Sequence, residues 1–193
     1  LFQEHLQGFK PYLQSQGKHY EPAILLGELA AAEKRLNYIA NLAPFNVQVW
    51  GDPGWETLIP HGVNYRGSAG HLHELTRIYN AAKIHIDIGR IYQADIVTMR
   101  VFDVLACGGF LLAEYSQGLE ALFKLGEELI CYRDIDELKG LVSHYLAHPD
   151  EAQAIAARGK RRVEWDHTIQ QRLQEMLKTM GLRTAARRTV LVG

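Results

Sequence analysis

The sequence predicts an α/β fold in which helices flank a parallel β-sheet, and three observations support this fold class. Short β-type runs alternate with amphipathic helical stretches along most of the chain, which is the pattern of βα units. The chain has 193 residues, 47% of them hydrophobic and 22% charged, which suits one well-buried globular domain. Glycine and polar residues follow several of the expected strands, as they do in the loops of such sheets. We therefore expect one domain with extra helices at its C-terminal end.

In the first half of the chain, we expect a strand wherever a short apolar or alternating run lies between turn signals. The apolar run AILLG is followed by a helical stretch that Pro44 prevents from continuing much further. The sequence GDPG, which begins at Gly51, marks a turn. The expected strands cover residues 23–27, 46–50 and 63–65, and the expected helices cover residues 1–16 and 30–42.

In the second half, helical periods and short strands alternate more regularly. A buried helix is expected to stop at Gly108 and Gly109, because glycine favours the end of a helix. The expected strands cover residues 83–88, 110–114 and 128–132. The expected helices cover residues 71–82, 98–106, 119–125, 135–147, 151–165 and 169–180.

Composition and charge disfavour several classes of protein. The net charge of −1 and the isoelectric point near 6.8 give no basic footprint for nucleic acid and no polybasic membrane signal. No apolar run approaches the roughly 18 residues that a membrane span needs. Cys107 and Cys131 form no CxxC pattern, which favours a reducing, cytoplasmic setting. Because the chain begins with Leu1, we expect it to come from within a longer polypeptide.

Neither a metal site nor a dinucleotide site is expected. His71 and His73 point to different faces of their predicted helix, and the pair His144 and His148 lacks a third ligand nearby. The glycine pair before the strand 110–114 is not a GxGxxG fingerprint, and it precedes a strand instead of opening a helix. Binding of NAD is therefore disfavoured.

Four loops that follow expected strands carry polar or glycine-rich residues. In open parallel sheets, ligands bind beyond the carboxyl ends of the strands, where loops and helix N-termini present backbone N–H groups. Turn geometry alone also explains such residues in any single loop. The loops contain residues 27–28, 66–68, 89–100 and 114–118.

The most specific segment is DIVTMRVFDVLACGG, residues 95–109. Asp95 and Asp103 lie eight positions apart, and a small-residue and glycine ending follows the second of them. This pattern resembles the donor-site helix of retaining GT-B glycosyltransferases. More closely, the segment resembles the glycosyltransferase-like family that includes the spore maturation proteins, in which a TMRxFExLACGG run precedes a strand and a helix. The resemblance implies that Asp103, where the wider family has Glu, contacts the ribose of a donor.

Weaker parts of the same resemblance lie elsewhere in the chain. Gly27 followed by Lys34 and Arg35 is similar to the strand–glycine–basic opening of the family, in which a basic side chain reaches the donor diphosphate. Arg66 and Gly67 match a glycine turn near the nucleobase. The helical tail matches the family at Glu137, Leu138, Arg162, His167, Thr168 and Arg172.

The residues around Arg100 have the chemistry that such a donor requires. A diphosphate needs cations or oriented N–H dipoles, and an arginine at the start of a helix supplies both. Thr98 beside it is either a helix N-cap or a hydroxyl for a phosphate. Asp103 is a carboxylate that can accept both hydrogens of a ribose diol. It also lies three residues after Arg100, so a neutralising ion pair between the two is the alternative.

The resemblance covers about residues 22–178 and implies a domain organisation. Residues 1–21 are a linker or leading helix, residues 22–181 a nucleotide-sugar-binding, Rossmann-like domain of the GT-B C-terminal type, and residues 182–193 a tail. The resemblance implies a nucleotide diphosphate-sugar as the substrate, and no metal or other cofactor is expected. The expected donor-binding residues are Gly27, Lys34, Arg35, Arg66, Gly67, Asp95, Thr98, Met99, Arg100 and Asp103.

The implied function is transfer of a hexosyl-type sugar to an unknown acceptor with retention of configuration. Acceptor contacts and catalytic residues are expected in an N-terminal GT-B domain that this sequence lacks, so the fragment alone should be inactive. The alternative is a non-catalytic nucleotide-sugar-binding or assembly module in a polysaccharide or spore-coat pathway. The replacement of Glu by Asp at positions 95 and 103 keeps this alternative open.

Overall fold

The computed structural model describes residues 21–70, 73–93 and 95–182. Its strands form two parallel sheets, which confirms the predicted α/β class. The predictions for residues 1–20 and 183–193 lie outside the described residues. The smaller sheet pairs β1 (Gln48–Val49) with β2 (Asn64–Tyr65), and the larger sheet has the order β3 (His85–Asp87), β4 (Leu111–Glu114), β5 (Ile130–Tyr132).

The central strand of the larger sheet, β4, is buried on both faces. Successive residues of a strand point to opposite faces, and Leu112 belongs to one core cluster while Leu111 and Ala113 belong to the other. All three side chains are at most 1% exposed. An entirely apolar strand interior is typical of a parallel sheet that helices cover on both sides.

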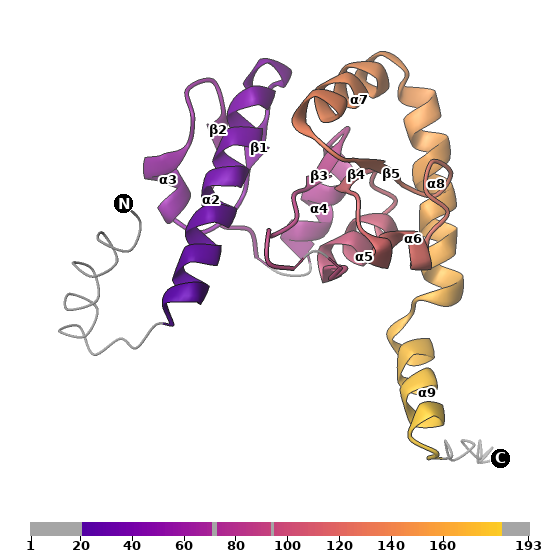
Figure 1. The fold of residues 1–193 in the computed structure, drawn as a ribbon. Helices are drawn as coiled ribbons and strands as arrows, with labels where there is room; N and C mark the ends of the chain where they lie inside the picture. Colours follow the sequence, from indigo (N-terminus) through magenta and orange to yellow (C-terminus); the bar gives the residue numbers. More distant parts are fainter. Residues whose placement is uncertain (1–20, 71–72, 94, 183–193) are drawn as a thin grey trace.

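Helices cover the two faces of this sheet in a regular way. In Figure 1, α7 lies above the sheet and α5 and α6, which connect its strands, lie below it. α2 and α7 contribute to the core cluster around Leu112, α5 and α6 to the cluster around Leu111, and α8 to both. The bounds are α2 (Pro22–Leu42), α5 (Met99–Ala106), α6 (Gln117–Leu122), α7 (Ile135–Ala147) and α8 (Pro149–Asp166).

The predicted strand over residues 23–27 is wrong, because these residues form the first turns of α2. Pro22 lies at the start of the helix, where its missing N–H and fixed φ are favourable. The sequence that follows is rich in alanine, leucine and glutamate, which are strong helix formers. Ile24 is 57% exposed and therefore occupies no core position. Helix propensity therefore outweighs the apolar run and makes residues 23–27 helical.

Most of the remaining elements occur where the sequence predicts them, several of them with shifted ends. The three strands expected over residues 46–50, 63–65 and 83–88 are trimmed to the short strands β1, β2 and β3. Asn46 adopts a left-handed conformation with φ 56°, which separates the 3₁₀ turn η1 (Ala43–Phe45) from β1. The helix α3 (Gly54–Leu58) was not predicted, and α4 (His73–Ala81) was.

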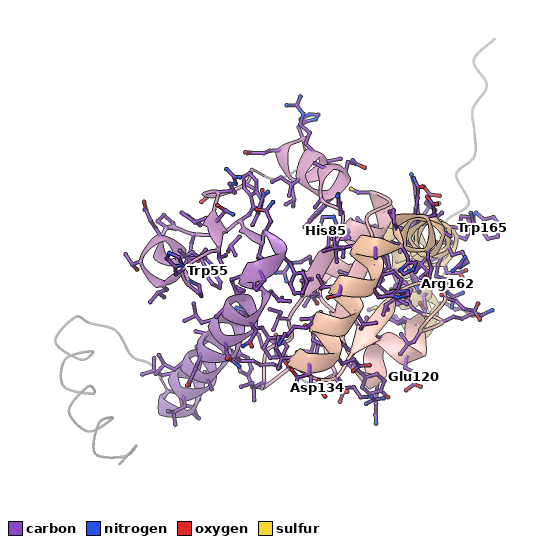
Figure 2. All side chains as sticks on the ribbon, turned by 90° about the horizontal axis from the view of Figure 1, so that it is seen from above. Trp55, His85, Glu120, Asp134, Arg162 and Trp165 are labelled. Atoms are coloured by element: carbon purple, nitrogen blue, oxygen red, sulfur yellow. The ribbon has the colours of Figure 1, made fainter. Side chains whose placement is uncertain are left out.

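The last helix of the described chain extends away from the larger sheet. Thr168 begins α9 (Ile169–Thr179) with a capping box that includes Gln171. α9 projects beyond the end of α8 in Figure 1, and Figure 2 shows Trp55 and Trp165 at opposite ends of the molecule. Within the described part of the chain, no helix combines the length and apolarity needed to span a membrane.

Candidate functional site

Two carboxylates lie at the carboxyl ends of neighbouring strands. Asp87 is the last residue of β3 and Glu114 is the last residue of β4. Because Asp87 is in register with Ala113, both side chains reach the same edge of the sheet. The buried Tyr132 hydroxyl donates to the backbone carbonyl of Asp87 at 2.9 Å and fixes the end of β3. Burial raises the pKa of Tyr132, so this donor keeps its proton.

Asp87 pairs with Arg100 in the first turn of α5. The Arg100 Nη1 atom lies 2.5 Å from Oδ1 of Asp87. The Thr98 hydroxyl lies 3.5 Å from Oδ2 of the same carboxylate. Thr98 is the N-cap residue of α5, but its side chain makes no capping hydrogen bond. The Asp87 side chain is 10% exposed and that of Arg100 is 52% exposed, so the guanidinium can reach a ligand while the carboxylate stays in the wall.

Lys34 of α2 pairs with the second carboxylate. Its ammonium group donates to both oxygens of Glu114, at 2.6 and 2.7 Å. The backbone N–H of Gly89 also donates to Glu114, at 2.9 Å. The two side chains are each 20% exposed. Glu114 therefore ties α2 to the loop that follows β3.

Three arginines converge on a cavity of about 200 Å³ beside these ion pairs. Arg35 comes from α2, Arg90 from the loop after β3 and Arg100 from α5. Burial lowers the pKa of Arg35 from its ordinary value, and the positive charges of Arg90 and Arg100 lower it further. Among the described residues, no carboxylate lies within ion-pair distance of Arg35. The cavity also has Ile88, Gln93, Ile96 and Thr98 in its wall.

The partners of Arg90 are exposed and hold it only loosely. Its Nη1 atom donates to the Tyr92 hydroxyl at 2.8 Å and lies 3.3 Å from Glu28. The Arg90 side chain is 40% exposed and that of Glu28 is 47% exposed, and an exposed pair of this kind contributes little to stability. Arg90 can therefore exchange this partner for a ligand at small cost.

A second cavity of about 160 Å³ adjoins the first and has a different chemistry. Both carboxylates, Asp87 and Glu114, line it, and Arg90, Ile96 and Thr98 line both cavities. Polar and apolar residues both line this small cavity, a mixture that is common in small-molecule sites. The rest of its wall consists of Ile91, Val97, Val101, Tyr115, Ser116 and Leu119.

The structure brings only some of the predicted site residues together. Arg35, Thr98 and Arg100 line the arginine cavity. Lys34 lies beside the site but is held by Glu114. Met99 is 67% exposed and lines neither cavity.

The other predicted residues lie outside both cavities. Gly27 lies in α2, next to the ring of Tyr92 from the loop after β3. Arg66 and Gly67 follow β2, and Gly67 has φ +84°. Asp95 is exposed, and its backbone carbonyl approaches Gly118 so closely that a Cβ there would lie 2.6 Å away. Asp103 is exposed on α5. In the described part of the chain it forms no ion pair with Arg100, whose partner is Asp87.

Three residues at the site were missed from the sequence: Asp87, Arg90 and Glu114. Asp87 was interpreted as a polar residue within an alternating strand, and its place at the end of β3 was the signal that could have found it. Arg90 and Glu114 fall in the loops that follow strands, but no motif distinguished them there. Their importance depends on contacts between residues far apart in sequence, such as Lys34 with Glu114.

Comparison with known proteins agrees with the architecture. The chain is similar in structure to a sucrose-phosphate synthase from Thermosynechococcus elongatus, with a TM-score of 0.54 and 18% identity, a likeness that shows the fold alone. The similarity covers 76% of this chain and 43% of that protein, so the chain spans less than half of its length. No curated protein gives a significant match. The model of a family described as glycosyl transferase-like matches residues 28–178, and the chain therefore belongs to this family.

Proposed function

We propose that this chain binds a nucleotide diphosphate-sugar and acts as the donor-binding domain of a glycosyltransferase. The observation that carries the proposal is the convergence of Arg35, Arg90 and Arg100 on one cavity at the carboxyl edge of the sheet. Arg35 is partly buried and has no carboxylate within ion-pair distance among the described residues, and a guanidinium in such a place is costly unless an anion neutralises it. A diphosphate supplies several negative oxygens that match the planar donors of arginine.

The two adjoining cavities suit the two parts of such a donor. The diphosphate lies among the arginines, near the N-terminus of α5, where the helix dipole adds to the attraction. The sugar enters the cavity lined by Asp87 and Glu114, whose oxygens accept hydrogen bonds from hydroxyl groups. The shared residue Thr98 lies at the junction of the two cavities.

The complete reaction requires more than this site. In the proposed enzyme, a second domain supplies the acceptor contacts and the catalytic groups, and the 193-residue chain alone transfers no sugar. Retention of configuration, a hexosyl donor, the spore maturation subtype and a cytoplasmic location belong to the same proposal. The alternative is a non-catalytic nucleotide-sugar-binding or assembly module in a polysaccharide or spore-coat pathway, and the aspartates at positions 95 and 103 keep it open.

The proposal is tested by ligand-induced thermal stabilisation. We expect one nucleotide series among UDP, ADP, GDP and dTDP, with their glucose or mannose conjugates, to raise the melting temperature. A ligand at about 100 times its dissociation constant stabilises the folded state by about 2.7 kcal/mol. Arg35→Ala should remove about 1.5–3 kcal/mol of the binding free energy, because it deletes a charged hydrogen-bond donor.

Arg161→Ala is the matched control, because Arg161 is an exposed arginine of α8 that lines neither cavity. It should bind the same ligand as the unchanged protein does. Stabilisation by none of the nucleotides, or an equal loss in both variants, would refute the proposed site.

A further inference from the structure

We infer that Asp87 binds a hydroxyl group of the donor sugar and thereby couples the sugar to the diphosphate through Arg100. The inference rests on the proposed function and assigns the sugar contact within that site. Asp87 lines the smaller cavity, whereas Arg100 lines the arginine cavity. One carboxylate therefore lies between the two parts of the donor.

The two oxygens of Asp87 have very different partners. Oδ1 accepts a charged hydrogen bond from Arg100 at 2.5 Å. Oδ2 has only the Thr98 hydroxyl, at 3.5 Å, which is at the limit of a hydrogen bond. A carboxylate oxygen can accept two hydrogen bonds, and leaving that capacity unused in a side chain only 10% exposed is unfavourable. Oδ2 thus belongs to a carboxylate that lines a cavity, and it lacks a close donor among the described residues.

Glu114, the other carboxylate of the cavity, has much less capacity left. Lys34 donates to both of its oxygens, and the Gly89 N–H donates to Oε2 as well. The described residues also contain no group of three or more His, Cys, Asp or Glu side chains that could hold a metal ion. Of the two carboxylates in this cavity, Asp87 thus has more capacity left to accept a hydrogen bond from a hydroxyl group.

The contact has a consequence for affinity. A sugar hydroxyl on Oδ2 and a phosphate beside Arg100 act on the same ion pair. Fixing the carboxylate from one side orients the guanidinium on the other, so the two parts of the donor should bind cooperatively. Asp87 then contacts the sugar directly, and its ion pair with Arg100 positions that guanidinium for the phosphate.

The test is a cycle between Asp87→Asn and deoxy-sugar donors, measured by calorimetric titration. The probes are the tightest-binding conjugate among the glucose and mannose conjugates of UDP, ADP, GDP and dTDP, and its 2-, 3-, 4- and 6-deoxy analogues. We expect one deoxy analogue to bind the unchanged protein about tenfold more weakly, which corresponds to about 1.4 kcal/mol. The same analogue should bind Asp87→Asn with less than a twofold penalty relative to the parent donor.

Asp87→Glu is the second variant, in case Asp87→Asn does not fold. It keeps the negative charge but moves the carboxylate by one methylene. The loss of affinity for the deoxy analogue, relative to the parent donor, should therefore become smaller. Circular dichroism checks that the variant is folded. An unchanged deoxy penalty in a folded variant, or no penalty for any analogue in the unchanged protein, would overturn the inference. If the unchanged protein binds none of UDP, ADP, GDP and dTDP and none of their glucose or mannose conjugates, the proposed function itself fails.

Discussion

At the scale of single residues, Asp103 occupies a position that suits a ligand contact better than an internal ion pair. It lies one turn after Arg100 on α5 and is exposed. Within the described residues its carboxylate has no ion pair, because Asp87 holds Arg100. Its negative charge does reach α4, where it contributes to the raised pKa of Tyr79, although burial is the main cause there. The ribose contact implied by the motif remains a prediction.

We predict that Asp103→Asn weakens binding of the nucleotide diphosphate by about 1–3 kcal/mol, because an amide replaces one acceptor oxygen with a donor. The loss should almost vanish with a 2′,3′-dideoxy nucleotide, which has no diol. Calorimetric titration of both proteins with both ligands gives the coupling energy. A coupling energy near zero would show that Asp103 does not contact the ribose.

The sequence could not distinguish neighbouring residues whose surroundings differ. Lys34 and Arg35 are adjacent basic residues, and both were assigned to the diphosphate. On α2 they point to different partners, since Lys34 reaches Glu114 and Arg35 faces the other arginines. The motif did identify Arg100 and Thr98, which line the arginine cavity, because both lie within a short segment whose spacing carries the signal. Asp87 has its partner 13 positions away, beyond the reach of such a pattern.

At the scale of elements, helix signals proved more informative than short apolar runs. The run AILLG was interpreted as a strand, but a five-residue apolar run does not distinguish a strand from the first turns of a helix. By contrast, α7 begins and ends as predicted, and Asp134 caps it by accepting a hydrogen bond from Glu137 N–H at 2.9 Å. The cap and the periodicity of α7 lie within the helix itself. The conformation of residues 23–27 was instead set by the longer helical segment that follows them.

The packing of α8 against the rest of the domain gives a prediction about two helical glycines. A Cβ at Gly159 would collide with the backbone carbonyl of Glu128 and lie 2.8 Å from Leu105 of α5. Gly159→Ala should therefore destabilise the protein by about 1–3 kcal/mol, the usual cost of overpacking. Gly140 in α7 has no such neighbour within 4 Å.

Gly140→Ala is the matched control for this glycine and should stabilise the protein by about 0.5–1 kcal/mol, because alanine is the better helix former. Urea denaturation of both variants gives the free energies of unfolding. Similar effects of the two substitutions would contradict the close packing of α8 on α5 at this point.

At the scale of the whole molecule, the fold class could be predicted and the division into sheets could not. Alternation of strands and helices is a property of the sequence itself, and the parallel sheets confirm it. That β1 and β2 pair with each other, apart from β3, β4 and β5, follows from contacts between distant segments. The candidate site depends on the same contacts, since α2, the loop after β3 and α5 each contribute one arginine.

The measurement that tests the central claim most directly is a crystal structure of the chain with the nucleoside diphosphate that stabilises it most. We predict that the phosphate oxygens lie within about 2.7–3.0 Å of the guanidinium nitrogens of Arg35 and Arg100, the range of charged hydrogen bonds. The terminal phosphate should point toward the cavity lined by Asp87 and Glu114. A diphosphate bound elsewhere, with no phosphate oxygen in contact with Arg35 or Arg100, would contradict the account.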